Sequence, residues 1–259
     1  DLGGKFTNAF LREFDLRMNW EVVSEFSYNA LIGRTLEKTG TSAAFFDPEK
    51  TEPIFDHLKE WLEANNLQAI QKETFQPFLV GILNRMRTRG GVDHPFLEKF
   101  RSDGLRLWDL NWMKDPRHFL NKMFGPKSRF PRLVTTSPHH LGLLDSTYTL
   151  NNNWFRNYFL KSFKTATGYS PIINDFYKRL FQNLNYAGIL NDKGGEPTKN
   201  YSISTESLLV SNEVRLMECN TCGNKLSISG KENFYNRIFC LDYKCPGQYE
   251  NEVEPDSNY

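Results

Sequence analysis

Cysteine is scarce in this sequence. The chain of 259 residues contains four, and none of them lies outside residues 219–245. The sequence also lacks a run of about eighteen apolar residues, which a membrane-spanning helix needs, and the basic-then-apolar leader of a secreted protein. We therefore expect no membrane partner and a reducing, cytoplasmic setting, in which thiolates are available to a metal.

Catalytic signatures are absent as well. The sequence has no Gly-x-x-x-x-Gly-Lys-Ser/Thr phosphate loop, no Gly-x-Ser-x-Gly elbow and no Gly-x-Gly-x-x-Gly fingerprint. His139 and His140, with Asp145 nearby, raise the hypothesis of a hydrolase. Adjacent histidines do not share one face of a helix or strand, however, and no His-Glu-x-x-His or His-x-Glu motif accompanies them. We predict no catalytic residue in this chain and expect a structural loop at the histidine pair.

The four cysteines form two closely spaced pairs. Two residues separate the first pair, four separate the second, and seventeen lie between the pairs, a spacing that predicts a zinc ribbon. Four thiolates leave no open position on the metal, which favours a structural Zn²⁺ over a catalytic one. Four unrelated cysteines or two disulfides are the alternatives. The predicted ligands are Cys219, Cys222, Cys240 and Cys245.

Helical periodicity dominates the first ninety residues. Apolar residues recur at helical spacing over 19–38, from about 51 to 64 and from about 75 to 88, so we expect this part to be all helical. Short helices are expected over 95–102 and 116–123, and the rest of 107–140 carries no clear pattern.

A winged-helix pattern follows. Helices are expected over 153–163 and 170–186, then a small-residue turn, a short strand, a polar loop over 191–200 and a second strand from Tyr201. Tyr201 and Ile203 should face the core, with Ser202 and Ser204 outward. The alternative is a plain helix followed by a hairpin.

Together these patterns predict a mainly α chain with small β elements. We expect a helical domain over 1–92, a winged-helix-like domain over 93–212, a zinc ribbon over 213–250 and a polar tail over 251–259. The chain begins at Asp1 without an initiator Met, which indicates processing or a piece of a longer protein.

Basic residues gather at two places, although the net charge is only +1. Three arginines stand at alternate positions before two glycines, where they could contact phosphates or complement a helix dipole. Four more basic residues flank the helices of the winged-helix pattern, where they could bind nucleic acid or form a solvated face. The candidate nucleic-acid contacts are Arg85, Arg87, Arg89, Lys161, Lys164, Lys178 and Arg179.

Two stretches, Trp20–Gly40 and Met86–Val92, together with the winged-helix pattern and the four cysteines, resemble a known group. They are similar to the accessory region beyond the motor of large bacterial DEAD/DEAH-box superfamily 2 helicases, of the kind found in anti-phage defence loci such as Druantia. The resemblance implies a module that grips or steers DNA, single-stranded or duplex, beside helicase motor domains in the same polypeptide or complex. The ATP-binding loop and acidic box of the motor are missing, so isolated ATPase activity is not expected.

We therefore expect a nucleic-acid-binding accessory module of a helicase. The alternative is a protein interaction scaffold in a defence or DNA-processing complex, with the aromatic-rich helices and the ribbon docking a partner. Steep salt dependence of binding would distinguish the first from the second, because phosphate contacts release counterions.

Overall fold

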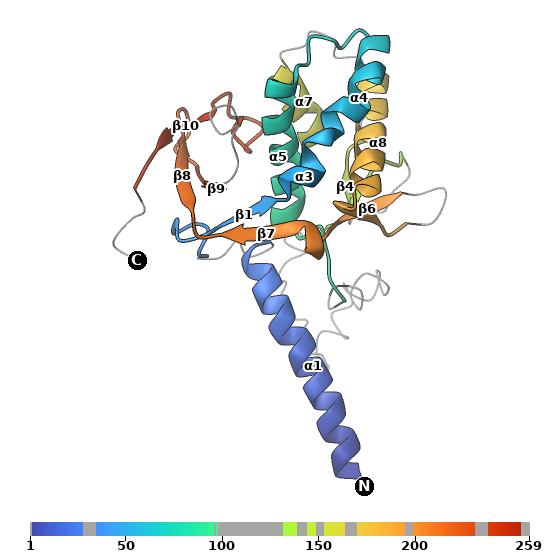
Figure 1. Cartoon of the computed structure of the whole chain (residues 1–259), viewed down its shortest axis with the longest axis vertical. Coiled ribbons are helices and arrows are strands. Elements are labelled where there is room, and N and C mark those ends of the chain that lie inside the picture. Colours follow the sequence, from blue (N-terminus) through green and yellow to red (C-terminus); the bar gives the residue numbers. More distant parts are fainter. Residues whose placement is uncertain are drawn as a thin grey trace.

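The computed structural model describes residues 2–27, 35–95, 97, 132–138, 144–148, 153–163, 170–194, 199–230 and 238–254. In these residues, three sheets of two, three and five strands accompany the helices (Figure 1). The prediction of a mainly α chain is therefore wrong, and the fold is mixed α/β. The missed strands are short: β2, β3 and β4 have two residues each, too few to show the alternation that identifies a strand in a sequence.

Four of the predicted helices are confirmed, with small shifts at their ends. The helix predicted over 19–38 begins much earlier and ends at Glu25, and residues 36–40 form turns. The helix predicted over 116–123 and most of that over 95–102 lie outside the described residues. The helices are α1 (Leu2–Glu25), α3 (Pro48–Thr51), α4 (Pro53–Ala64), α5 (Lys72–Thr88), α7 (Trp154–Phe163) and α8 (Ser170–Tyr186).

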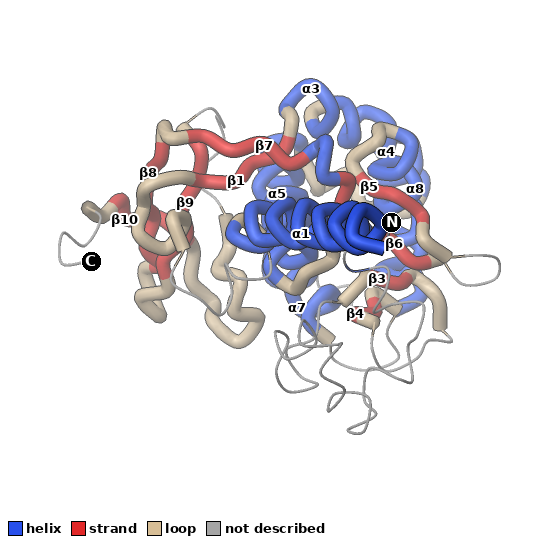
Figure 2. The backbone as a smooth tube through the Cα atoms, turned by 90° about the horizontal axis from the view of Figure 1, so that it is seen from below, coloured by secondary structure: helices blue, strands red, loops and turns tan. Residues whose placement is uncertain are grey.

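The strands form three separate sheets. β1 pairs with β7, β8 lies between β9 and β10, and the five-stranded sheet contains β2 to β6. Figure 2 shows β8, β9 and β10 at one end of the molecule and β3, β4 and β6 at the other. The strands are β1 (Ala43–Phe46), β2 (Val92–Asp93), β3 (Val134–Thr135), β4 (Asp145–Ser146), β5 (Leu190–Asp192), β6 (Asn200–Ser204), β7 (Leu208–Ser211), β8 (Val214–Cys219), β9 (Lys225–Ser229) and β10 (Tyr249–Glu252).

Strand β6 belongs to a larger sheet than the expected wing. It pairs antiparallel with β5 and β3 and parallel with β2, so the hairpin that follows α8 is built into the five-stranded sheet. Tyr201 and Ile203 are buried as predicted. Ser202 and Ser204, expected to face outward, are buried too, because both faces of this central strand are covered.

One apolar core joins the helices to this sheet. Helices α4, α5, α7 and α8 stand side by side (Figure 1), and their aromatic rings gather around Phe78 of α5, with Phe163 at 4.6 Å and Tyr158 at 5.6 Å between ring centroids. The core continues from Trp20 to Ile203. Core residues therefore lie on both sides of the domain boundary predicted between residues 92 and 93.

Helix α1 projects from this body (Figure 1). Trp20, near the C-terminal end of α1, is fully buried in the core, whereas several large apolar side chains at other positions of the helix are exposed. No described helix combines the length and the hydropathy needed to cross a membrane. The exposed apolar side chains of α1 are Phe10, Leu11, Phe14, Met18 and Val22.

Candidate metal centre

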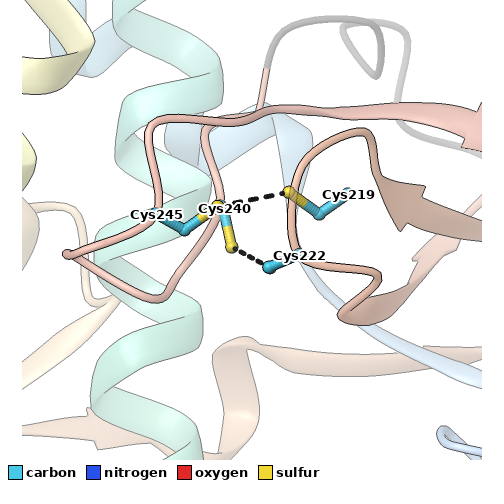
Figure 3. A group of neighbouring side chains, drawn as sticks. All are labelled: Cys219, Cys222, Cys240 and Cys245. Atoms are coloured by element: carbon cyan, nitrogen blue, oxygen red, sulfur yellow. Dashed lines mark hydrogen bonds between the residues drawn. The ribbon is translucent and has the colours of Figure 1, made fainter.

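The four cysteines converge at one point (Figure 3). Their sulfur atoms all lie within 4.8 Å of one another. The Sγ atoms of Cys219 and Cys245 are 3.6 Å apart, and those of Cys222 and Cys240 are 3.5 Å apart. A tetrahedron with metal–sulfur bonds of about 2.3 Å has sulfur–sulfur edges of about 3.8 Å, whereas a disulfide bond measures about 2.05 Å. The spacing fits four ligands around a metal ion and excludes disulfides as they stand.

Local backbone structure presents the first pair of thiols. Cys219 is the last residue of β8, and the turn that follows brings Cys222 back beside it. Gly223 completes the turn with a φ of 72°, which a side chain would strain, and its N–H donates to the Cys219 carbonyl at 3.1 Å.

The second pair is held by a loop that comes very close to the first. Within it, the Cys245 N–H donates to the Asp242 carbonyl, and the Gly247 N–H donates to the Cys245 sulfur at 3.4 Å. A Cβ atom on Gly247 would lie 2.7 Å from the Cys219 sulfur, closer than real contacts allow. A glycine is therefore required where the two loops meet.

The thiols differ in their readiness to ionise. Burial raises the pKa of Cys219, but backbone hydrogen bonds from Cys222 and Thr221 outweigh it and lower the pKa to about 7. Burial raises the pKa of Cys240 to about 12 and also raises that of Cys245. Four adjacent thiolates are stable only beside a compensating cation, so the donor set itself favours a bound metal.

Helix α7 clamps the loop that carries Cys240 and Cys245. The Lys161 ammonium donates to three loop carbonyls, those of Cys240 at 2.6 Å, Cys245 at 3.0 Å and Asp242 at 3.1 Å. One and two turns before it, Tyr158 donates to the Phe239 carbonyl at 3.4 Å and Trp154 to the Leu241 carbonyl at 2.8 Å. The metal centre is therefore fastened to the helical body.

This clamp changes the interpretation of Lys161. The sequence predicted Lys161 as a nucleic-acid contact, but its ammonium donates hydrogen bonds to three backbone carbonyls around the cysteines. Burial lowers its pKa, and the nearby Cys240 thiolate opposes that effect. Lys161 supports the metal loop and is not a free phosphate contact.

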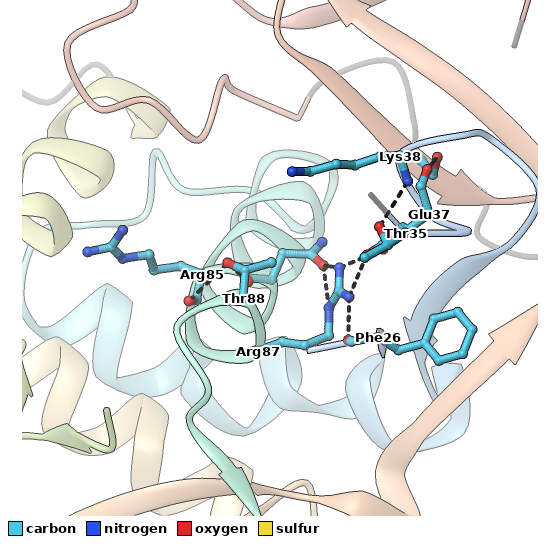
Figure 4. Close-up of polar contacts among 9 residues, drawn as sticks. Phe26, Thr35, Glu37, Lys38, Arg85, Arg87 and Thr88 are labelled. Atoms are coloured by element: carbon cyan, nitrogen blue, oxygen red, sulfur yellow. Dashed lines mark hydrogen bonds and ion pairs between the residues drawn. The ribbon is translucent and has the colours of Figure 1, made fainter. Parts of the chain in front are cut away.

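Arg87 is also turned inward. Its side chain is 1% exposed and forms a two-pronged ion pair with Glu37, with both Nη–Oε distances at 2.7 Å. Asn84 and the Phe26 carbonyl accept its remaining hydrogen bonds (Figure 4). Because its donors are used and buried, Arg87 cannot reach a phosphate.

Arg85 lies on another face of α5, and Figure 4 shows it pointing away from Arg87; Arg89 is the residue directly after the helix. Both approach Asp145, at 3.2 Å from the Arg85 Nη2 atom and at 3.9 Å from the Arg89 Nε atom. The positive charge of Arg132 lies close enough to Arg85 to disfavour its charged form, and the backbone N–H of Arg132 donates to the Arg89 carbonyl at 2.9 Å. We call these four residues, Arg85, Arg89, Arg132 and Asp145, the arginine cluster.

The remaining candidates lie elsewhere. Lys178 and Arg179 are exposed on α8, and Arg179 pairs with Asp175 at 3.4 Å and lies over the Trp61 ring. Lys164, His139 and His140 lie outside the described residues.

Sequence reasoning did not identify the roles of three residues that contribute to these sites. Arg132 and Trp154 carry no motif, and Asp145 drew notice only as a neighbour of the histidine pair. Their partners are far away in the chain, since Asp145 meets arginines of α5 and Trp154 meets the metal loop. Only the excess of arginine and lysine over 85–132 hinted at the cluster.

Comparison of the chain with protein-family models, with curated proteins and with solved structures gave no match in any of the three.

Proposed function

We propose that this chain is a nucleic-acid-binding accessory module whose C-terminal sheet is stabilised by a structural Zn²⁺ ion. The observation that carries the proposal is the arginine cluster. Arg85 and Arg89 share the carboxylate of Asp145, and Arg132 adds a third positive charge, so the four residues together carry two more positive charges than negative ones. Arginine is the residue best suited to bind phosphate, because its planar fork offers several donors to the phosphate oxygens.

Zinc is the metal that the donor set supports. Four cysteine thiolates in a tetrahedron are typical of structural Zn²⁺, and the closed coordination leaves no position for a substrate. The described residues contribute four sulfurs and a lysine that donates to the surrounding carbonyls. Zinc in this position joins the turn after β8 to the loop that carries Cys240 and Cys245, and Lys161 ties that loop to α7.

The helicase context is supported by the resemblance of Trp20–Gly40 and Met86–Val92 to helicase accessory regions. In that setting, the motor domains would hydrolyse ATP elsewhere in a cytoplasmic complex, and this chain would hold the DNA strand. Arg85, in the last turn of α5, and Arg89, the residue just after the helix, are the contacts that agree with both the resemblance and the geometry.

Fluorescence anisotropy with labelled single-stranded and duplex DNA, at 50 and 200 mM salt, tests the proposal. Each neutralised phosphate contributes a slope of about −0.7 to −0.9 in log K against log salt, so binding should weaken steeply. Zinc should be quantified on the same sample and should amount to about one ion per chain. Zinc without salt-dependent DNA binding would reject nucleic acid as the ligand.

A protein interaction scaffold is the second candidate, favoured by the exposed apolar side chains of α1. Phe10, Phe14 and Met18 follow one another at four-residue spacing, and each is about half exposed. Replacing Phe10 and Phe14 with Gln leaves the arginine cluster intact. Loss of binding to a partner protein in these variants, with DNA binding unchanged, would favour the scaffold.

A further inference from the structure

We propose that the arginine cluster binds a single phosphate group with the charge of a phosphomonoester, such as the terminal phosphate of a nucleic acid strand. The inference rests on the proposed function, since it specifies which part of a nucleic acid the cluster takes. The same chemistry could also come from a free phosphate ion, and the experiment below distinguishes the two sources.

The cluster is assembled from three separated segments. Arg85 lies in the last turn of α5 and Arg89 is the C-cap residue just after it, and both side chains approach Asp145. Arg132 is tied to that end by its hydrogen bond to the Arg89 carbonyl, and a Cβ on Gly91 would lie 3.0 Å from the Arg132 carbonyl. Asp145 reaches the same place through β4, which pairs with β3 beside it. Each member is thus held by backbone contacts.

Several polar atoms in the cluster lack a partner. The buried Nε atoms of Arg85, Arg89 and Arg132 make no hydrogen bond in the described part of the chain. The Oδ2 atom of Asp145 is buried beside them and forms the ion pairs with Arg85 and Arg89. Leaving a buried donor unsatisfied is costly, and more so for a charged group. A bound oxyanion supplies the acceptors that these donors need.

Charge selects the kind of phosphate. Arg85, Arg89 and Arg132 against Asp145 leave two positive charges uncompensated. The negative end of the α5 dipole offsets only roughly half a charge. A phosphomonoester carries about −1.5 to −2 at pH 7, which matches the remainder, whereas a backbone phosphodiester carries a single charge. Burial lowers the pKa of Arg85, Asp145 opposes that effect, and Arg89 and Arg132 lower the pKa further, so a bound anion would favour the charged form of Arg85.

Exposure favours one phosphate over a length of backbone. The side chains of Arg85 and Arg89 are each 22% exposed and that of Asp145 is 16% exposed. An end group can enter such a partly covered position, whereas a continuous strand must run past it. Asp145 also repels a second phosphate placed beside the first.

The test compares one oligonucleotide carrying a 5′-phosphate, a 3′-phosphate or hydroxyl ends, by fluorescence anisotropy with the zinc-loaded chain. Inorganic phosphate serves as competitor, with chloride at equal ionic strength as its control. The variants are the double change Arg85→Gln and Arg89→Gln, the single change Asp145→Asn, and Lys59→Gln as an exposed control on α4. Zinc content and the unfolding midpoint verify that each variant is folded.

One phosphorylated end should bind at least tenfold more tightly than the hydroxyl end, and inorganic phosphate should remove this preference. The double variant should lose the preference, and Asp145→Asn should strengthen it several-fold, a gain that misfolding cannot imitate. Equal binding of all three oligonucleotides would overturn the inference and leave the proposed function standing. If inorganic phosphate binds and none of the oligonucleotides does, the proposed function is overturned and free phosphate is the source.

Discussion

Arg85 and Arg87 show how strongly position on a helix decides what a residue does. Two residues apart, they differ by about 200° around α5. Arg87 therefore enters the protein and pairs with Glu37, while Arg85 meets Asp145 at the surface of the helical body. The sequence identified both as candidate phosphate contacts, and its spacing already indicated that they could not share a face. The sequence could not indicate which arginine pairs with a buried carboxylate, because Glu37 lies fifty residues away from Arg87 in the chain.

Arg87→Ala is expected to destabilise the protein severely. It leaves Glu37, which is 5% exposed, as a buried charge without its partner, and removing one member of a buried pair costs about 3–5 kcal/mol. Urea unfolding measures the change. Arg179→Ala is the matched control, since its surface pair with Asp175 contributes about 0.3–0.5 kcal/mol. Equal losses in the two variants would contradict the role given to Arg87.

The four cysteines of the candidate metal site were the most predictable residues in the chain. Cysteine spacing carries information because the thiolates of each pair must reach one ion, and the structure brings all four together as expected. Gly223 follows from the same logic, as the turn after Cys222 needs a positive φ. Gly247 is needed for a different reason, close approach between loops, which spacing alone does not reveal.

At the scale of elements, α7 and the Cys240–Cys245 loop act as one unit. Trp154, Tyr158 and Lys161 form a stripe along α7 that donates to the carbonyls of Leu241, Phe239 and Cys240, respectively. The sequence predicted α7 itself, because its apolar periodicity is clear. The polar atoms of that stripe gave no signal, since their partners lie about eighty residues later.

Lys161→Ala is expected to weaken metal binding by roughly 10–100-fold, the usual effect of removing a group that supports metal ligands from behind. The variant frees three carbonyls that the ammonium now satisfies, two of them belonging to metal ligands. Competition with a chromophoric zinc chelator measures the affinity. Lys178→Ala, an exposed lysine on α8, should leave it unchanged. Unaltered affinity in the Lys161 variant would show that the clamp does not support the site.

Short strands limited what the sequence could predict about the elements. β1 has four consecutive buried residues, a run without alternation that fits a buried helix equally well. β2, β3 and β4 exist through pairing with strands distant in the chain. Helices α4, α5, α7 and α8 could be predicted because their pattern is local and long.

At the scale of the whole molecule, the metal centre and the main core share contacts. Val80 of α5 packs in the small cluster that contains Cys219, Cys240 and Cys245. The Ser227 hydroxyl of β9 donates to the carbonyl of Glu37, the residue that pairs with Arg87. Loss of the metal should therefore lower the stability of the main core as well as that of the C-terminal sheet.

Removing the metal proposed to be Zn²⁺ with a chelator is expected to lower the thermal midpoint of the main unfolding transition. Structural zinc contributes folding free energy, and about 3 kcal/mol transmitted to the core corresponds to a fall of roughly 6–12 °C for a chain of this size. Differential scanning calorimetry before and after chelation measures it. A separate, early transition with the main midpoint unmoved would mean that the C-terminal sheet folds independently.

The central claim, that this molecule binds nucleic acid through its arginine cluster, is tested most directly by one comparison of salt dependence. Anisotropy titrations with a 5′-phosphorylated single strand should be run from 50 to 200 mM salt for the zinc-loaded chain and for the variant carrying Arg85→Gln and Arg89→Gln. The account predicts weaker binding in the variant and a salt slope that is shallower by at least about 0.7, one phosphate contact. Identical affinities and slopes in two folded, zinc-loaded proteins would contradict it.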